Sequence, residues 1–135
     1  YPTCSVYAVE VQDAFVQYLE KQKEAKKLDR VQVWKGEANQ LPKFLQLVDM
    51  IIMVDVYHEL EFPFEMLQQM YKALQPNGEL VLIEYRGEDP NSPIKPLHTT
   101  TVQQLNKELG MAGFELTKKL DFLPMQHFLV YRKRR

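Results

Sequence analysis

One continuous apolar run, Met50 to Val54, constrains the fold more than any other part of the 135-residue sequence. The run does not alternate with polar residues and is too short to cross a membrane, so it predicts a strand buried on both faces of a sheet. An acid, a phenol, an imidazole and a second acid follow it: Asp55, Tyr57, His58 and Glu59. Ligands of open α/β sheets bind at the carboxyl ends of parallel strands. This polar cluster is therefore a candidate site, although a capped strand end with a solvated turn gives the same pattern.

Strand and helix patterns alternate along the rest of the chain. Short apolar or β-branched runs predict strands, and apolar positions at helical spacing predict amphipathic helices that pack on a sheet. The last two strands have too few residues between them for a helix and are expected to pair antiparallel. The expected order is strand 6–9, helix 12–27, strand 31–34, crossover 39–47, strand 50–54, helix 63–74, strand 80–84, a helix after residue 101, and strands 114–120 and 126–132. This order predicts an α/β fold: a Rossmann-like, doubly wound, mostly parallel sheet that ends in an antiparallel hairpin, in a single domain over residues 1–135.

Local signals mark the ends of the later helices. Pro63 suits a first helical position, and Thr101 with Gln104 three residues later forms a capping box. The dipeptide Asn77-Gly78 predicts a turn between a helix and the next strand.

Composition excludes some classes of function. The 17 Lys and Arg nearly balance the 18 Asp and Glu, so no basic field points to nucleic acid. His58, His98 and His127 are far apart in the sequence and lack metal-ligand spacing, so no metal site is predicted. Cys4 is the only cysteine and the sequence shows no signal peptide or membrane-spanning stretch, which together predict a cytoplasmic protein without a membrane partner. Because the chain starts at Tyr1 and not at Met, a targeting signal before it stays open.

Five weak signals follow one another in a recognisable order. They are an acid ending an early strand, a Gly-acid-Ala step after the next strand, the polar cluster after the third, a Pro-x-Gly turn into the fourth, and an Ala-Gly-Phe step before the final hairpin. The residues are Glu10, Gly36–Ala38, Asp55–Glu59, Leu74–Tyr85 and Ala112–Phe114. Together they resemble the class I S-adenosylmethionine-dependent methyltransferase family. The resemblance covers essentially the whole chain but begins at the family's second strand.

The family's first strand and the glycine-rich loop after it have no counterpart here. No G-x-G-x-x-G pattern occurs in the sequence. In the family's sheet the missing strand lies between the strands matched by 6–9 and 50–54, so these two would have unpaired inner edges. We expect that residues preceding Tyr1 supply the strand. The alternative is a homo-oligomer in which a partner chain completes the sheet.

The resemblance implies S-adenosylmethionine as the cofactor and assigns four residues of the first half to it. The carboxylate of Glu10, with Val11 beside it, would accept hydrogen bonds from both ribose hydroxyls. Glu37 would accept the exocyclic amine of adenine, and the N–H of Ala38 would bind a ring nitrogen. A solvated glutamate at a helix N-terminus is the alternative for Glu10.

In the polar cluster the resemblance implies a second group of site residues. Asp55, Val56 and Tyr57 would line the floor beneath the sulfonium, with backbone groups holding the methionine part. His58 and Glu59 are the candidates for catalysis. Methyl transfer is an in-line displacement that depends mostly on alignment, so a base is required only where the acceptor atom must lose a proton. A structural histidine is the alternative for His58.

Tyr85 and Arg86 follow the next strand and are candidates for binding the acceptor. The proline-rich loop 87–98 after them is long for this fold, and long loops often serve as lids or specificity segments. Lys95 and His98 in this loop are expected to be solvated.

The leading hypothesis is methyl transfer from S-adenosylmethionine to an unidentified acceptor, with a small molecule favoured. A non-catalytic methyltransferase-like module that binds a partner is the alternative, because the glycine-rich loop has no counterpart. Another doubly wound domain, such as a nucleotide-binding or receiver-type module, is disfavoured by the closing hairpin.

Overall fold

The structure is a computed structural model that describes residues 3–43 and 46–135. The chain divides into two compact units, residues 1–43 and 44–135, and each is described by itself. That residues 1–135 form a single domain stays a prediction. No helix among the described residues has the length and apolar character needed to span a membrane.

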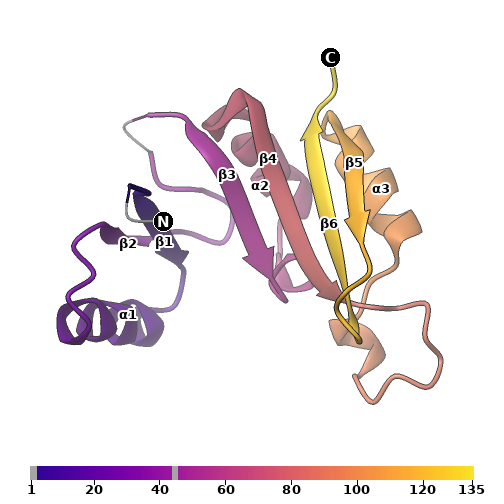
Figure 1. Cartoon of the computed structure of the whole chain (residues 1–135), viewed down its shortest axis with the longest axis horizontal. Helices are drawn as coiled ribbons and strands as arrows, with labels where there is room; N and C mark the ends of the chain where they lie inside the picture. Colours follow the sequence, from indigo (N-terminus) through magenta and orange to yellow (C-terminus); the bar gives the residue numbers. More distant parts are fainter. Residues whose placement is uncertain (1–2, 44–45) are drawn as a thin grey trace. The chain divides into compact units, whose positions relative to one another are not determined.

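The first unit contains a pair of parallel strands and one helix (Figure 1). Strand β1 (Val6–Glu10) pairs in register with β2 (Val31–Lys35), so that Glu10 lies opposite Lys35. Helix α1 (Asp13–Ala25) connects them, close to the predicted range. Parallel pairing brings the ends of both strands to the same edge, which places the residues after β1 and after β2 next to each other.

The second unit contains a four-stranded sheet in the order β3-β4-β6-β5. The pair β3·β4 is parallel, while β4·β6 and β5·β6 are antiparallel, which confirms the predicted terminal hairpin. The strands are β3 (Val48–Val54), β4 (Leu74–Tyr85), β5 (Phe114–Leu120) and β6 (Gln126–Lys133); the helices are α2 (Pro63–Ala73) and α3 (Val102–Met111), with short 3₁₀ turns η1 (Tyr57–Glu59) and η2 (Pro96–His98).

Helices α2 and α3 lie on one face of this sheet (Figure 1). Side chains alternate along a strand, so every second residue of β4 faces them. Leu80, Leu82 and Glu84 are these residues, and each is 0% exposed. The helices supply Leu67, Leu105 and Leu109, which are also fully buried. One carboxylate therefore lies in the same buried row as two leucines.

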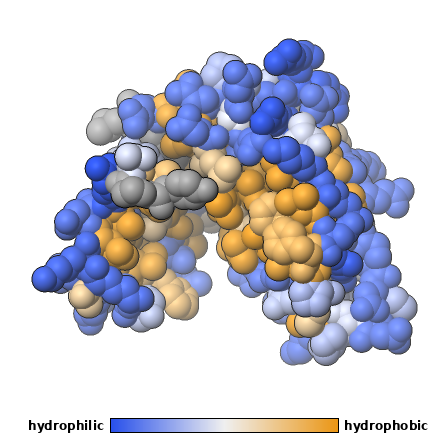
Figure 2. Space-filling model, viewed as in Figure 1, coloured by the Kyte–Doolittle hydropathy of each residue, from blue (hydrophilic) through white to orange (hydrophobic). Residues whose placement is uncertain are grey.

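The opposite face of β3 is exposed, contrary to the expectation of a strand buried on both faces. Met50, Ile52 and Val54 are 48%, 57% and 50% exposed, whereas Met53, which points to the other face, is buried. Figure 2 shows apolar side chains gathered over this sheet. The expectation fails because the helices of this unit cover one face only.

Both predicted helix starts are confirmed. Pro63 is the first residue of α2, and the hydroxyl of Thr101 accepts a hydrogen bond from the N–H of Gln104 at 3.1 Å. The predicted Asn77-Gly78 turn instead lies inside β4.

A bulge explains why the turn residues belong to the strand. Leu74 pairs with Val48 and Glu79 with Met50, so β4 advances five residues while β3 advances two. A Cβ at Gly78 would lie 2.9 Å from the Leu74 side chain and 3.2 Å from a carbonyl of β3, so any larger residue would force these neighbours to shift. The predicted crossover 39–47 is irregular where the structure describes it, and residues 44 and 45 lie outside the described residues.

Candidate active site

Glu10 is the last residue of β1, and its carboxylate binds the backbone just before α1. Its Oε1 accepts hydrogen bonds from the N–H groups of Val11 at 2.7 Å and Gln12 at 2.9 Å. These amides precede the first turn of α1, where backbone donors lack helical partners. Oε2 has no hydrogen-bond partner among the described residues. The carboxylate is thus held by one oxygen and presents the other.

Glu37 and Ala38 follow β2 in a tight turn at the same edge as Glu10. The backbones of Glu37 and Gln40 exchange two hydrogen bonds at 3.0 and 3.3 Å, and Ala38 lies exposed between them. The N–H of Gly36 donates to the carbonyl of Glu10 at 2.9 Å, which joins this turn to the end of β1. The first unit therefore brings its four predicted cofactor residues together.

Asp55, directly after β3, has a left-handed backbone with φ of 52°. Aspartate tolerates this conformation better than most residues, and such strain clusters at functional sites. Its N–H donates to the carbonyl of Ile83 at 2.8 Å, and the Nε2 of Gln126 donates to both carboxylate oxygens at 2.9 and 2.7 Å. The side chain is therefore tied to β6, while the backbone turns the chain away from the sheet.

Glu84 is the centre of the buried hydrogen bonds beneath this turn. Its Oε1 accepts from the N–H groups of Val56 at 3.1 Å and Tyr57 at 2.7 Å, and its Oε2 lies 2.6 Å from Nδ1 of His58. A buried carboxylate is costly unless its oxygens are hydrogen-bonded, and here both are. Glu84 already accepts two backbone N–H groups, which favours its carboxylate as the acceptor in this third contact and Nδ1–H of His58 as the donor. The Nε2 atom of His58 is left with a free lone pair.

That lone pair faces two side chains from different segments. Nε2 of His58 lies 3.3 Å from Nδ1 of His98 on η2 and 3.8 Å from Oε1 of Glu59. The rings of His58 and His98 meet edge to face with centroids 5.3 Å apart. The side chain of His58 is 8% exposed, whereas those of Glu59 and His98 are 64% and 51% exposed. The expectation of a solvated His98 therefore missed this contact.

The ring of Tyr57 turns into the core. It is 5% exposed, and its hydroxyl donates to Oε2 of Glu108 at 2.6 Å. Burial, together with the hydrogen bond to the Glu108 carboxylate, raises the pKa of Tyr57 far above its ordinary value. Only the backbone of Tyr57 is thus at the end of β3, where the cofactor residues were predicted.

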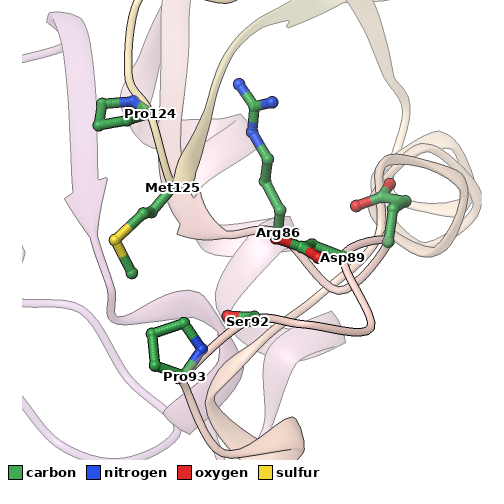
Figure 3. Close-up of a pocket in the computed structure, with 7 residues that line it drawn as sticks. Arg86, Asp89, Ser92, Pro93, Pro124 and Met125 are labelled. Carbon is green, nitrogen blue, oxygen red and sulfur yellow. The ribbon is translucent and has the colours of Figure 1, made fainter.

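Arg86 anchors a loop and lines a cavity of about 310 Å³. Its Nε donates to the carbonyl of Gln126 at 3.2 Å and its Nη2 to that of Leu123 at 3.1 Å. Figure 3 shows Arg86 and Asp89 on one side of the cavity and Pro93, Pro124 and Met125 on the other. Part of the wall comes from the proline-rich loop. Tyr85 does not line this cavity; its carbonyl accepts the N–H of Thr100 at 3.0 Å.

Glu88 links the same loop to α3 and β6. Its Oε1 accepts the N–H of Val102 at 2.7 Å, and its Oε2 lies 2.7 Å from Nε2 of His127. His127, on β6, is 3% exposed, so this contact is buried on the His127 side. The loop is therefore fastened at its start.

The chain matches the model of the methyltransferase domain family over residues 1–127. Its fold is similar to that of an S-adenosylmethionine-dependent methyltransferase from Aquifex aeolicus, with 24% identity, a TM-score of 0.86, and 94% of this chain and 68% of that chain covered. A putative type 11 methyltransferase from Sulfolobus solfataricus is 17% identical with a TM-score of 0.75, covering 97% and 72%.

A third similar fold is that of an O-methyltransferase from neocarzinostatin biosynthesis, in complex with S-adenosyl-L-homocysteine and 1,4-dihydroxy-2-naphthoic acid. It is 13% identical with a TM-score of 0.80, and 96% of this chain and 42% of that chain are covered. No curated protein matches the chain by sequence. The fold is thus that of the class I methyltransferases, as predicted. The chain belongs to the methyltransferase domain family.

The cofactor of this class is S-adenosylmethionine, and the described residues fit it in each unit. The unpartnered Oε2 of Glu10 suits a ribose hydroxyl, which needs an acceptor. At the end of β3 the carbonyl of Asp55 accepts no hydrogen bond from the described residues, and an ammonium group requires such acceptors. The N–H groups of Val56 and Tyr57 are taken by Glu84 and are not available.

The sequence pointed to His58 but not to Glu84, and it did not reveal the contact between His58 and His98. Glu84 stands in the apolar run Leu80–Glu84, where it looks like the polar end of a strand. The signal that could have revealed it is the strand period of two, because Glu84 shares a face with Leu80 and Leu82. No comparable signal marks His98, which lies 40 residues from His58.

Proposed function

We propose that this chain transfers a methyl group from S-adenosylmethionine to a small molecule that loses a proton in the reaction. One observation carries the proposal: buried Glu84 holds Nδ1 of His58 at 2.6 Å and so turns the Nε2 lone pair toward exposed side chains. A histidine fixed in this way can take up a proton from an acceptor, and the carboxylate stabilises the charge that the ring gains.

In the first unit we propose cofactor contacts at the edge where β1 and β2 end. Oε2 of Glu10 would accept from the ribose, with Val11 beside it. Glu37 and Ala38 would take the adenine, since both are exposed in a turn that two backbone hydrogen bonds hold rigid. The proposal for Glu37 and Ala38 rests on the family resemblance together with this geometry.

In the second unit we propose that the backbone after β3 holds the methionine part. The carbonyl of Asp55 is the acceptor available for the amino group, since it accepts no hydrogen bond from the described residues, and Asp55 itself has a left-handed φ of 52°. Val56 and Tyr57 contribute main chain and shape, because Glu84 uses their N–H groups. The bound cofactor would supply a methyl group on a positively charged sulfur. An aligned nucleophile attacks the methyl carbon, and the sulfur leaves as a neutral thioether.

We propose that His58 takes the acceptor's proton and that Glu59, 3.8 Å from Nε2, assists by its negative charge. Arg86 and Tyr85 remain the candidates for acceptor contacts. Support for Arg86 comes from the cavity of about 310 Å³ that it lines, which is within the size range of small-molecule sites. The naphthoic acid bound by the neocarzinostatin enzyme also favours a small acceptor. A cytoplasmic location, a homo-oligomer and the absence of a nucleic-acid partner stay predictions.

Titration of the chain with S-adenosyl-L-homocysteine by calorimetry tests the cofactor part. We expect binding that Glu10→Gln weakens by about 10- to 100-fold, which corresponds to losing charged hydrogen bonds of about 1.5–3 kcal/mol. Glu24→Gln, at an exposed position of α1, is the matched control and should bind like the wild type. Absence of binding would favour the non-catalytic alternative, and equal affinity of both variants would remove Glu10 from the site.

Transfer of the methyl group to hydroxylated aromatic acids, followed with labelled cofactor, tests the catalytic part. His58→Gln should keep the affinity for S-adenosyl-L-homocysteine but lower kcat by about 10²- to 10⁴-fold, the usual contribution of a positioned base. If kcat stays within a factor of two or three of the wild type, His58 is a structural residue.

A further inference from the structure

Three potential metal ligands meet beside the turn after β3. They are Nε2 of His58, Oε1 of Glu59 and Nδ1 of His98. The separations are 3.3 Å between the two nitrogens, 3.8 Å from His58 to Glu59, and 4.0 Å from His98 to Glu59. All three residues lie in the second unit and come from η1 and η2.

These separations leave room for one small divalent ion bonded to all three atoms. The point equidistant from the three atoms lies about 2.2 Å from each, close to the zinc–nitrogen and zinc–oxygen lengths of about 2.0–2.2 Å. An ion at this point, or slightly above the plane of the three atoms, would reach all of them without movement of the backbone. Exposed acidic groups are common on surfaces without an ion, and what distinguishes this group is the short distance from each atom to the centre, together with two histidines among the ligands.

The buried carboxylate of Glu84 prepares His58 as a ligand. Metal-binding histidines typically donate their second ring N–H to a carboxylate or carbonyl, which fixes the tautomer and the ring orientation. Glu84 accepts from Nδ1 of His58 at 2.6 Å and is itself fixed by two backbone N–H groups. The ring is 8% exposed and therefore held in place. The supporting interaction of a metal site is thus already built.

The donor set defines the class of metal. Two imidazole nitrogens and one carboxylate oxygen suit Zn²⁺ and similar transition-metal ions, whereas Mg²⁺ and Ca²⁺ prefer oxygen ligands only. Three protein ligands leave at least one coordination position open, and the exposure of Glu59 and His98 gives access to it. We propose that His58, Glu59 and His98 form a binding site for a Zn²⁺-type ion whose open position takes water or an oxygen atom of a small molecule.

The two roles of Nε2 on His58 exclude each other at any moment. In the metal-free protein this atom takes up the proton that the methyl acceptor loses, or it accepts a hydrogen bond from Nδ1–H of His98. In the metal-bound protein the ion occupies the lone pair, and a hydroxyl bound to the ion loses its proton more readily because the metal stabilises the oxyanion. The metal site does not depend on the proposed methyl transfer.

The test titrates the full chain, without a histidine tag, with Co²⁺ in the absence of cofactor and acceptor. We expect one ion per chain, with the visible absorption of a low-coordinate Co²⁺ site, and displacement of the colour by Zn²⁺. His98→Ala and Glu59→Gln each remove one ligand at an exposed position and should weaken binding at least tenfold. Glu84→Gln should weaken it by about 10- to 100-fold, as loss of such a supporting interaction usually does.

The matched control is Glu61→Gln, an exposed acid two residues from Glu59 that is not part of the cluster. It should bind Co²⁺ like the wild type. Nitrogen NMR of the rings gives a second readout, in which Zn²⁺ shifts Nε2 of His58 and Nδ1 of His98 and leaves His127 unchanged. The proposal is overturned if no Co²⁺ binds, or if His98→Ala binds it as tightly as the wild type. A histidine pair that shares only a hydrogen bond would give the first result, and an ion held elsewhere would give the second.

Discussion

Replacing Glu84 perturbs the turn after β3 more than any exposed substitution in the site. Three hydrogen bonds converge on this fully buried carboxylate, from the N–H groups of Val56 and Tyr57 and from Nδ1 of His58. Glu84→Ala leaves these donors without an acceptor and opens a cavity. A buried polar group left without its partner costs about 1–3 kcal/mol, and three donors lose theirs here, so we expect the free energy of unfolding to fall by at least about 3 kcal/mol.

Glu84→Gln separates the two halves of the network. The amide oxygen can still accept from Val56 and Tyr57, so most of the backbone support survives. The amide NH₂ then faces Nδ1 of His58, which must become an acceptor and move its proton to Nε2. One charge-assisted hydrogen bond is lost, so the free energy of unfolding should fall by about 1.5–3 kcal/mol.

Urea denaturation measures both losses, and nitrogen NMR of the His58 ring reports the tautomer. Glu115→Gln, at an exposed position of β5, is the control and should stay within about 0.5 kcal/mol of the wild type. The reasoning is refuted if Glu84→Gln unfolds at the same urea concentration as the wild type, or if Nε2 of His58 remains unprotonated in the variant.

Two further predictions concern the rest of the second unit. Gly113 has φ of +92°, and a Cβ there would lie 3.1 Å from the ring of Tyr71, so Gly113→Ala should lower the free energy of unfolding by about 1–3 kcal/mol. Gly110 lies inside α3, and a Cβ there would meet nothing closer than 3.5 Å, so Gly110→Ala should raise the free energy of unfolding by up to about 1 kcal/mol. Equal urea midpoints for the two variants would contradict this. Burial alone would raise the pKa of Glu88, but hydrogen bonds from Val102 N–H and His127 outweigh it and hold the pKa below the ordinary 4.5. The Glu88 carboxylate therefore contributes stability above pH 4.5, and this stability is lost as the pH falls through the lower pKa of the folded state. Glu88→Gln should therefore flatten the decline in the free energy of unfolding below pH 4.5. An unchanged slope would contradict the assignment.

Most of the fold could be predicted because its signals are local. Pro63 and Thr101 start their helices as expected, and the short link before residue 126 made an antiparallel pair the only solution. The turn predicted at Asn77-Gly78 failed because the same dipeptide also serves a bulge inside a strand. The prediction that β3 is buried on both faces was wrong as well, since an apolar run does not reveal whether helices cover one face of the sheet or both.

The site was predictable only where the chemistry stands together in the sequence. Asp55 to Glu59 is visible as a polar cluster after an apolar strand. His98 is not, because its contact with His58 depends on the path of the proline-rich loop. The prediction of no metal site rested on spacing along the chain, and a contact between segments 40 residues apart escapes that criterion.

The position of Glu84 links the stability of the turn to its chemistry. The chain leaves β3 through a left-handed residue, and the two amides that follow point into the protein, where they need an acceptor. A buried carboxylate on the neighbouring parallel strand satisfies both with one oxygen, since the ends of parallel strands lie side by side. Its second oxygen then requires a donor, and His58 is the residue within reach. The orientation of the His58 ring thus follows from the backbone's own requirement for hydrogen bonds. A proton or a metal ion at Nε2 uses a geometry that the fold maintains for its stability.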